Sequence, residues 1–191
     1  MHHSPSLVQA RRISQRGLTM VELMVTIVIV GILAAIGSVS VKRYVAASKT
    51  SETVHMFANV KAAQETYKDE TFNYLNVSPG LTATSDFFPA NSSPGQKRMN
   101  FAGTGTIADK WTALGIHEDA PMLFVYACTA GAIGTKPTAT GSDITVANWP
   151  SATSGKPWYI VKARADLDGD GVNTVFITAS FAGEIYSAND L

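Results

Sequence analysis

Three aspartates stand at alternate positions in the stretch ADLDGDGVN: Asp166, Asp168 and Asp170, followed by Gly171. Carboxylates this close repel one another unless hydrogen bonds, water or a cation neutralise them. Ca²⁺ prefers such hard oxygen ligands, and a glycine allows the sharp turn of a loop around the ion. Two interpretations therefore stand: a calcium site formed by the three aspartates, or an exposed turn, in which Asp and Gly are favoured.

The acidic stretch is not an EF-hand loop. Counting from Asp166, the twelfth position is Ile177 and not the glutamate that such loops use. Sequence typical of strands, and not of helices, lies on both sides. Calcium is the cofactor for which the sequence offers ligands.

A second chemically unusual group is a lone carboxylate, Glu22, at the start of an apolar run. The next 19 residues, Leu23 to Val41, carry no charge. At about 1.5 Å per residue they make about 28 Å of helix, close to the thickness of a hydrocarbon core. The pattern predicts a membrane-spanning helix over residues 18–41. A carboxylate in lipid is costly and normally has a partner.

The segment before this run has the wrong order for an ordinary secretory signal. Residues 1–17 are polar and basic, with Arg11, Arg12 and Arg16, and the small residue Gly17 precedes the apolar run. A secretory signal has its small-residue cleavage site after its apolar region. Cleavage after Gly17 would leave the apolar segment as the new N-terminus of the protein.

The stretch RGLTMVELMVTIVIVGILAAIG, from Arg16 to Gly37, resembles the class III leader and N-terminal helix of type IV pilins and pseudopilins. The resemblance implies that a prepilin peptidase cuts between Gly17 and Leu18 and that Leu18 is then N-methylated. Glu22 becomes the fifth mature residue. Residues 1–17 are accordingly the predicted leader peptide.

The resemblance also implies a partner for the lone carboxylate. In a filament of identical subunits, Glu22 of one copy meets the new α-ammonium of Leu18 in its neighbour. Such a buried pair fixes register more than it adds stability. Gly31 and Ala35 form a small-xxx-small pair that allows close helix packing during assembly.

The remaining residues, 42–191, are predicted to form a globular head. Helical sequence without Pro or Gly continues over residues 42–70, with Val54, Phe57, Val60, Gln64 and Tyr67 on one face. Residues 76–110 have loop composition. Four segments, 121–129, 157–166, 173–181 and 183–188, indicate strands. We expect an α+β fold, with a long N-terminal helix against an antiparallel sheet of three or four strands that has one covered face, as in pilins.

Composition and motifs argue against other classes of function. Without residues 1–17, which hold three of the 15 basic residues, 12 basic residues face 15 acidic ones. This balance disfavours nucleic acid as the main partner. No G-x-S-x-G, P-loop, H-E-x-x-H or C-x-x-C motif occurs, so no enzyme is predicted. The single cysteine, Cys128, lies in an apolar run and is interpreted as a buried small side chain.

Taken together, these features predict a structural subunit of a type IV pilus. The resemblance implies a prepilin anchored once in the bacterial inner membrane, processed by a peptidase and methyltransferase, and extruded by an assembly platform as a surface filament for adhesion and twitching motility. Two alternatives are a minor pilin and a pseudopilin of a type II secretion system. A third, from another class, is a single-pass membrane anchor that presents a binding module and does not polymerise.

Overall fold

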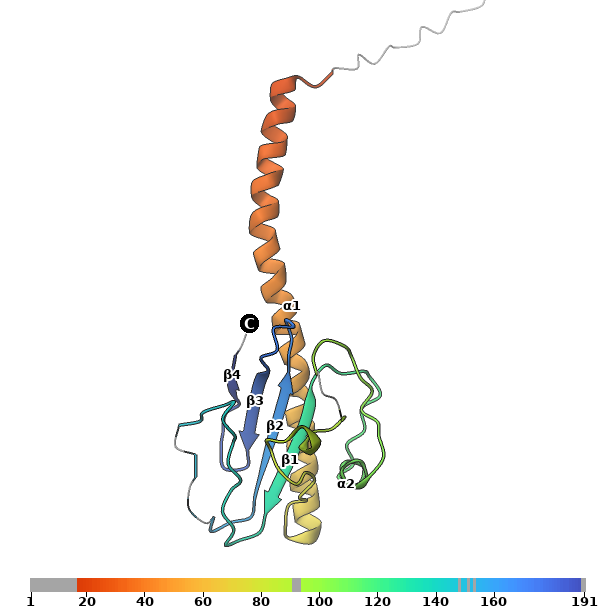
Figure 1. The fold of residues 1–191 in the computed structure, drawn as a ribbon, viewed down its shortest axis with the longest axis vertical. Helices are drawn as coiled ribbons and strands as arrows, with labels where there is room; N and C mark the ends of the chain where they lie inside the picture. The colour runs from red at the N-terminus through yellow and green to blue at the C-terminus, as the bar shows by residue number, and fades with distance from the viewer. Residues whose placement is uncertain (1–16, 91–93, 148, 151, 153, 190–191) are drawn as a thin grey trace, which may run out of the picture. The chain divides into compact units, whose positions relative to one another are not determined.

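The structure is a computed structural model, and it describes residues 17–90, 94–147, 149–150, 152 and 154–189 (Figure 1). Two helices, α1 (Met20–Thr71) and α2 (Thr106–Ala113), accompany four strands, β1 (Val125–Gly131), β2 (Trp158–Ala165), β3 (Thr174–Ala179) and β4 (Tyr186–Ala188). A short 3₁₀ helix, η1, spans Thr84–Asp86. The chain divides into two compact units, Met1–Lys42 and Arg43–Leu191.

Helix α1 runs for 52 residues because no proline interrupts it. It ends where Phe72 takes a positive φ of 63° and its N–H bonds the carbonyl of Lys68 at 2.7 Å. Within the second unit, α1 packs on one face of the sheet through Met56, Phe57 and Val60. The predicted apolar face is therefore right at Phe57 and Val60 but wrong at Val54, which is 50% exposed.

The four strands form one antiparallel sheet in the order β1-β2-β3-β4. Sequential strands pair as neighbours, as expected for a meander. Alternate residues of β2, namely Tyr159, Val161, Ala163 and Ala165, join the core that α1 covers. This arrangement confirms the predicted α+β fold, a long N-terminal helix with an antiparallel sheet. The strands are shorter than the segments that the sequence indicated.

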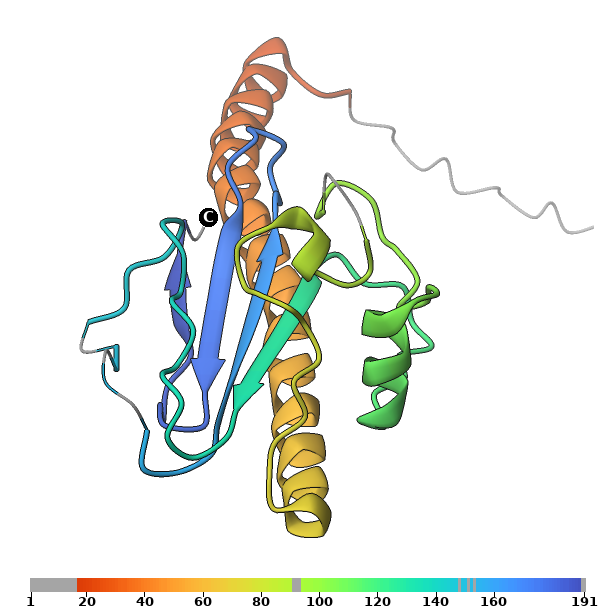
Figure 2. The same ribbon diagram turned by 60° about the horizontal axis from the view of Figure 1, so that its bottom comes forward.

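The opposite face of the sheet is also covered, contrary to the expectation of one covered face. All eight residues of β2 are buried. Leu81 and Phe87 from the segment before β1, with Ile144 and Val146 from the β1–β2 connection, pack over this outer face (Figure 2). Two cores therefore lie on the two sides of the sheet, and loops supply one of them.

A helix lies inside the stretch that composition assigned to loop. Helix α2 begins at Thr106, after Gly105 at φ 105°, and ends before Gly115 at φ 77°. It buries Ala108 and Trp111 in the core beside β1. Residues 76–110 were predicted as loop because Gly, Ser and Thr dominate them. A two-turn helix can nevertheless pack on the core through a single apolar face.

The exposed edge of β1 is closed by residues from outside the sheet. Phe88 exchanges two backbone hydrogen bonds with Tyr126, at 2.8 and 2.7 Å. The Ser78 N–H donates to the Cys128 carbonyl at 2.7 Å, and the Cys128 N–H donates to the Ser78 hydroxyl at 3.1 Å. Another chain therefore cannot add a strand at this edge of the sheet.

Cys128 is a buried core residue, as predicted. Its thiol lies 3.2 Å from Nε2 of Gln64, a side chain that also holds the backbone of Leu75. Burial raises the pKa of Cys128 to about 12, with the Gln64 bond opposing it. A thiol that stays protonated at neutral pH is not a nucleophile.

Candidate functional site

The first turn of α1 holds the lone carboxylate of the apolar segment. The Thr19 hydroxyl accepts a hydrogen bond from the Glu22 N–H at 3.2 Å, and the Thr19 carbonyl accepts from Leu23 at 3.1 Å. Thr19 is therefore the N-cap, and Glu22 occupies the third helical position, where a carboxylate also interacts favourably with the helix dipole. The sequence T-x-x-E is that of a capping box, a signal that sequence analysis missed.

Helix capping explains the position of Glu22 but leaves its charge without a counter-ion. Among the residues that the structure describes, three ion pairs occur, and none involves Glu22. The side chain is exposed, as are the apolar residues around it. Of the predicted leader, only Gly17 is described; residues 1–16, including the three arginines, lie outside the described residues.

None of the described residues covers the apolar part of α1. The 18-residue window Met20–Gly37 is long and apolar enough to cross a membrane, and none of it is buried. Gly31 has no atom outside its own helix within 4 Å of where a Cβ would lie, and Ala35 is exposed four residues later. The small-residue pair thus lies on an open helix surface, where another helix can approach closely.

The acidic turn lies between β2 and β3, and its three carboxylates are brought together. One oxygen from each of Asp166, Asp168 and Asp170 lies within 4.8 Å of the others. Two oxygens bound to one Ca²⁺ at 2.3–2.6 Å are at most about 5 Å apart, so the three carboxylates lie close enough together to reach one ion. The geometry fits the ion, but three carboxylates alone do not define a metal site, and calcium binding stays a prediction.

Asp166 has a structural role that needs no ion. Its carboxylate accepts hydrogen bonds from the backbone of Gly169 at 2.7 Å and Gly171 at 3.1 Å and from Nε2 of Gln96 at 3.2 Å. Burial of the carboxylate raises its pKa, but these bonds outweigh that effect, and the pKa of Asp166 is lowered. Asp168 and Asp170 are exposed. The turn therefore has one buried, anchored carboxylate and two exposed ones, which accept backbone hydrogen bonds from Asp170 at 3.4 Å and from Val172 at 2.7 Å.

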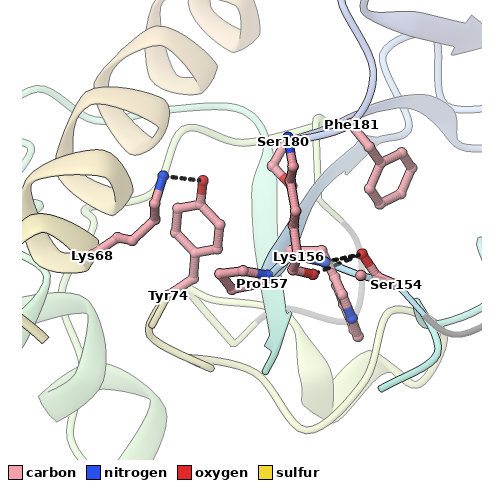
Figure 3. Close-up of a pocket in the computed structure, with 9 residues that line it drawn as sticks. Lys68, Tyr74, Ser154, Lys156, Pro157, Ser180 and Phe181 are labelled. Carbon is pink, nitrogen blue, oxygen red and sulfur yellow. Dashed lines mark hydrogen bonds between the residues drawn. The ribbon is translucent and has the colours of Figure 1, made fainter. Parts of the chain in front are cut away.

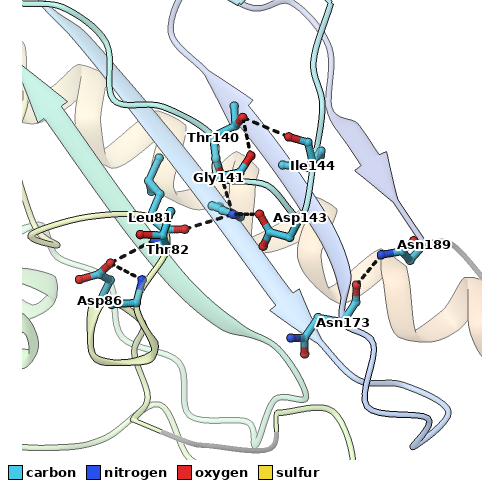
Figure 4. Close-up of polar contacts among 11 residues, drawn as sticks. Leu81, Thr82, Asp86, Thr140, Gly141, Asp143, Ile144, Asn173 and Asn189 are labelled. Carbon is cyan, nitrogen blue, oxygen red and sulfur yellow. Dashed lines mark hydrogen bonds and ion pairs between the residues drawn. The ribbon is translucent and has the colours of Figure 1, made fainter.

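A buried ammonium on β2 is the charged group that sequence analysis did not single out. Lys162 is fully buried on the outer face of the sheet. Its Nζ donates to the Thr140 carbonyl at 2.6 Å and the Leu81 carbonyl at 3.1 Å, and it pairs with Asp143 Oδ1 at 2.6 Å (Figure 4). All three donors of the ammonium are used. Burial lowers the pKa of Lys162, and Asp143 opposes this shift.

The Lys162 contacts tie two loops to the sheet. Leu81 belongs to the segment before β1, and Thr140 and Asp143 belong to the β1–β2 connection, as Figure 4 shows. Two residues further along β2, the Arg164 guanidinium lies 4.0 Å from the centre of the Phe87 ring. In a chain with a single cysteine, these polar contacts and the outer core hold the loops in place.

Comparison with known proteins identifies the N-terminal segment. Residues 12–38 match the family model described as the prokaryotic N-terminal methylation motif. The N-terminal segment is that of a type IV prepilin-like protein. This confirms the resemblance inferred from the leader, the glycine and the glutamate, and it points to a structural subunit.

A curated relative supports the same family. The chain is 40% identical over 72 residues to fimbrial protein EcpC of Eikenella corrodens. The aligned region is 37% of this chain and 47% of the relative, so the chain spans about half the length of the protein it matches. In the comparison with solved structures, none matches. The exposed apolar helix and the fimbrial relative fit membrane anchoring of a pilin-type subunit.

Proposed function

We propose that this protein is a subunit of a type IV pilus. The prepilin is held in the inner membrane by residues 18–41, cut between Gly17 and Leu18, methylated on Leu18 and polymerised into a surface filament. The observation that carries the proposal is an apolar helix with no cover of its own, Met20–Gly37, whose first turn contains a carboxylate without an ion pair among the described residues. The methylation motif over residues 12–38 supports the processing step.

Cleavage supplies what the helix lacks. Removing residues 1–17 creates an α-ammonium at Leu18, four residues before Glu22. Positions 18 and 22 are one helical turn apart, so the new ammonium lies one turn from Glu22 of the same chain. In this first turn, the Thr19 hydroxyl accepts the Glu22 N–H. A neighbouring copy, shifted along the filament, brings its own ammonium to the carboxylate. The charge pair then sets the stagger of packed apolar helices, which otherwise slide without preference.

The same N-terminal features serve pseudopilins and minor pilins, so location and abundance decide among them. The test is to shear filaments from the surface of the native cells and to measure the intact mass of their main protein. We expect a chain that begins at a methylated Leu18 and is the main component. The chain as a trace component would make it a minor pilin, and its absence from surface filaments would favour a pseudopilin. Retention of residues 1–17 would overturn the proposal of a polymerising subunit.

A further inference from the structure

A hollow in the second unit lies where α1 ends, at the turn after β3 and at the entrance to β2. Its volume is about 610 Å³, within the range of small-molecule sites. Figure 3 shows Lys68 and Tyr74 on one side and Phe181 on the other, with the segment that contains Lys156 between them. The proposed assembly through residues 18–41 makes no use of this pocket.

One of the two lysines in the pocket is already neutralised. Nζ of Lys68 donates to Glu65 at 2.9 Å and to the Tyr74 hydroxyl at 3.2 Å, and that hydroxyl donates to Glu65 at 2.7 Å. Hydrogen bonds from Glu65 and Tyr74 raise the pKa of Lys68, so its ammonium stays charged. Because Glu65 balances this charge, the trio contributes no net charge to the pocket.

The second lysine and one hydroxyl keep unused donors. Lys156 is exposed, and among the described residues its ammonium has no hydrogen bond or ion pair. The Ser180 hydroxyl accepts the Tyr159 N–H at 3.1 Å, which leaves its own proton free to donate. Ser154 is occupied by the backbone of Lys156 at 2.6 and 3.2 Å. The pocket therefore offers a ligand one positive charge and hydrogen-bond donors. These groups favour a ligand with a single anionic acceptor group.

An aromatic ring stands beside these donors. Phe181 is 40% exposed, and the edge contact of Trp149, at 5.1 Å between ring centres, holds it in place. The Trp149 indole N–H is fixed in turn by the Thr138 carbonyl at 3.1 Å. A partly exposed, braced ring offers an apolar face on which the C–H face of a sugar ring can stack.

We propose that this pocket binds one unit of an acidic saccharide, a sugar ring that carries a carboxylate. The carboxylate lies against the Lys156 ammonium and the Ser180 hydroxyl, and the sugar ring stacks on Phe181. A nucleic acid or other phosphodiester polymer fits less well, because such ligands neutralise a row of phosphates with several free cations. The pocket has one free cation among its described residues.

The test uses the full chain in micelles of dodecyldimethylamine oxide, a detergent with neither sugar nor phosphate. Saturation-transfer NMR titrations measure glucuronate and glucose directly, and inorganic phosphate as a competitor that displaces glucuronate, against the wild type, Lys156→Gln and Lys97→Gln. Lys97 is exposed and does not line the pocket, so it is the matched control. Assembly is not needed, so the result is independent of the proposed filament.

We expect glucuronate to bind about tenfold more tightly than glucose, and Lys156→Gln to remove that difference, as loss of one charged hydrogen-bonding group would. Lys97→Gln should leave it unchanged. Phe181→Leu should weaken glucuronate and glucose alike. Equal binding of both sugars, equal effects of the two lysine variants, or absence of binding would overturn the proposal. Phosphate binding as tight as glucuronate would also overturn it, because the site would then recognise charge and not sugar.

Discussion

Glu22 and Lys162 are both charged groups set among apolar residues, and they are satisfied in opposite ways. Lys162 lies in the second unit with every donor used, by Asp143 and two carbonyls, within 3.1 Å. Glu22 lies in the first unit on an exposed apolar helix, and no ion pair to it occurs among the described residues. The acidic turn is intermediate, because Asp166 is buried and accepts three hydrogen bonds, whereas Asp168 and Asp170 are exposed and each accept one backbone N–H.

This difference indicates which of the two units satisfies its charged and apolar groups within a single chain. The second unit buries two cores and neutralises its buried cation internally. None of the helical window 20–37 is buried by the described residues. Under the proposed function, lipid and then other copies cover its apolar surface, and the carboxylate sets register in the filament.

The largest expected loss of stability comes from removing the Lys162 ammonium in the second unit. Lys162→Met leaves the carbonyls of Leu81 and Thr140 and the Asp143 carboxylate without their donor. Breaking a buried pair costs 3–5 kcal/mol, and we expect about 3 kcal/mol, at the low end, because water can reach the partly exposed Asp143. Thermal unfolding of the full chain in micelles, followed by tryptophan fluorescence, measures it.

Two matched variants make the Lys162 result specific. Lys97→Met removes an exposed lysine and should change stability by less than about 0.5 kcal/mol. Asp143→Asn keeps an acceptor for the ammonium and should cost about 1 kcal/mol. A loss from Lys162→Met no greater than that from Lys97→Met would show that the buried ammonium does not hold the loops.

A smaller effect is expected at the acidic turn from calcium. With an affinity typical of extracellular sites, about 1 mM, 10 mM Ca²⁺ should stabilise the second unit by about 1.4 kcal/mol. The melting temperature should rise with Ca²⁺ but not with Mg²⁺, which demands a stricter geometry. The double variant Asp168→Asn/Asp170→Asn should abolish the rise. If Ca²⁺ does not change the melting temperature of the wild type, the turn is a hydrogen-bonded loop and not a calcium site.

The smallest effect is the pH dependence of Asp166. Its pKa is lowered in the folded chain, so its carboxylate stabilises the fold above the unfolded-state pKa, near 4. That stabilisation is lost as the pH falls through the folded-state pKa. Asp166→Asn should therefore melt below the wild type at pH 7, and the two melting temperatures should converge once the pH is below the folded-state pKa. A difference that persists unchanged in acid would contradict this role for the ionised carboxylate.

Local sequence signals predicted the elements well. The apolar run and the absence of proline indicated α1, and runs of β-branched and aromatic residues indicated the four strands. The T-x-x-E cap at Thr19 and Glu22 was also readable, since it depends on four consecutive residues. Helix α2 was missed because eight residues are only about two helical turns, too few for their apolar periodicity to stand out from the polar residues around them.

Contacts between distant segments could not be predicted. Lys162 lies between Val161 and Ala163 in β2, and no residue next to it in the sequence indicates that it is buried. Its burial depends on Leu81 and Thr140, which are 81 and 22 residues away. The anchoring of Asp166 by Gln96 spans 70 residues. Such pairings follow from the fold of the loops, for which a single sequence offers no periodic signal.

The most direct test of the account is the filament yield of Glu22→Gln compared with that of Thr19→Ala in the native cells. Glutamine keeps the Thr19 cap and removes the charge, whereas Thr19→Ala removes the cap and keeps the charge. Both variants should insert in the membrane as the wild type does. The account predicts that sheared filaments are lost in Glu22→Gln and retained in Thr19→Ala. Normal filaments from Glu22→Gln would contradict it.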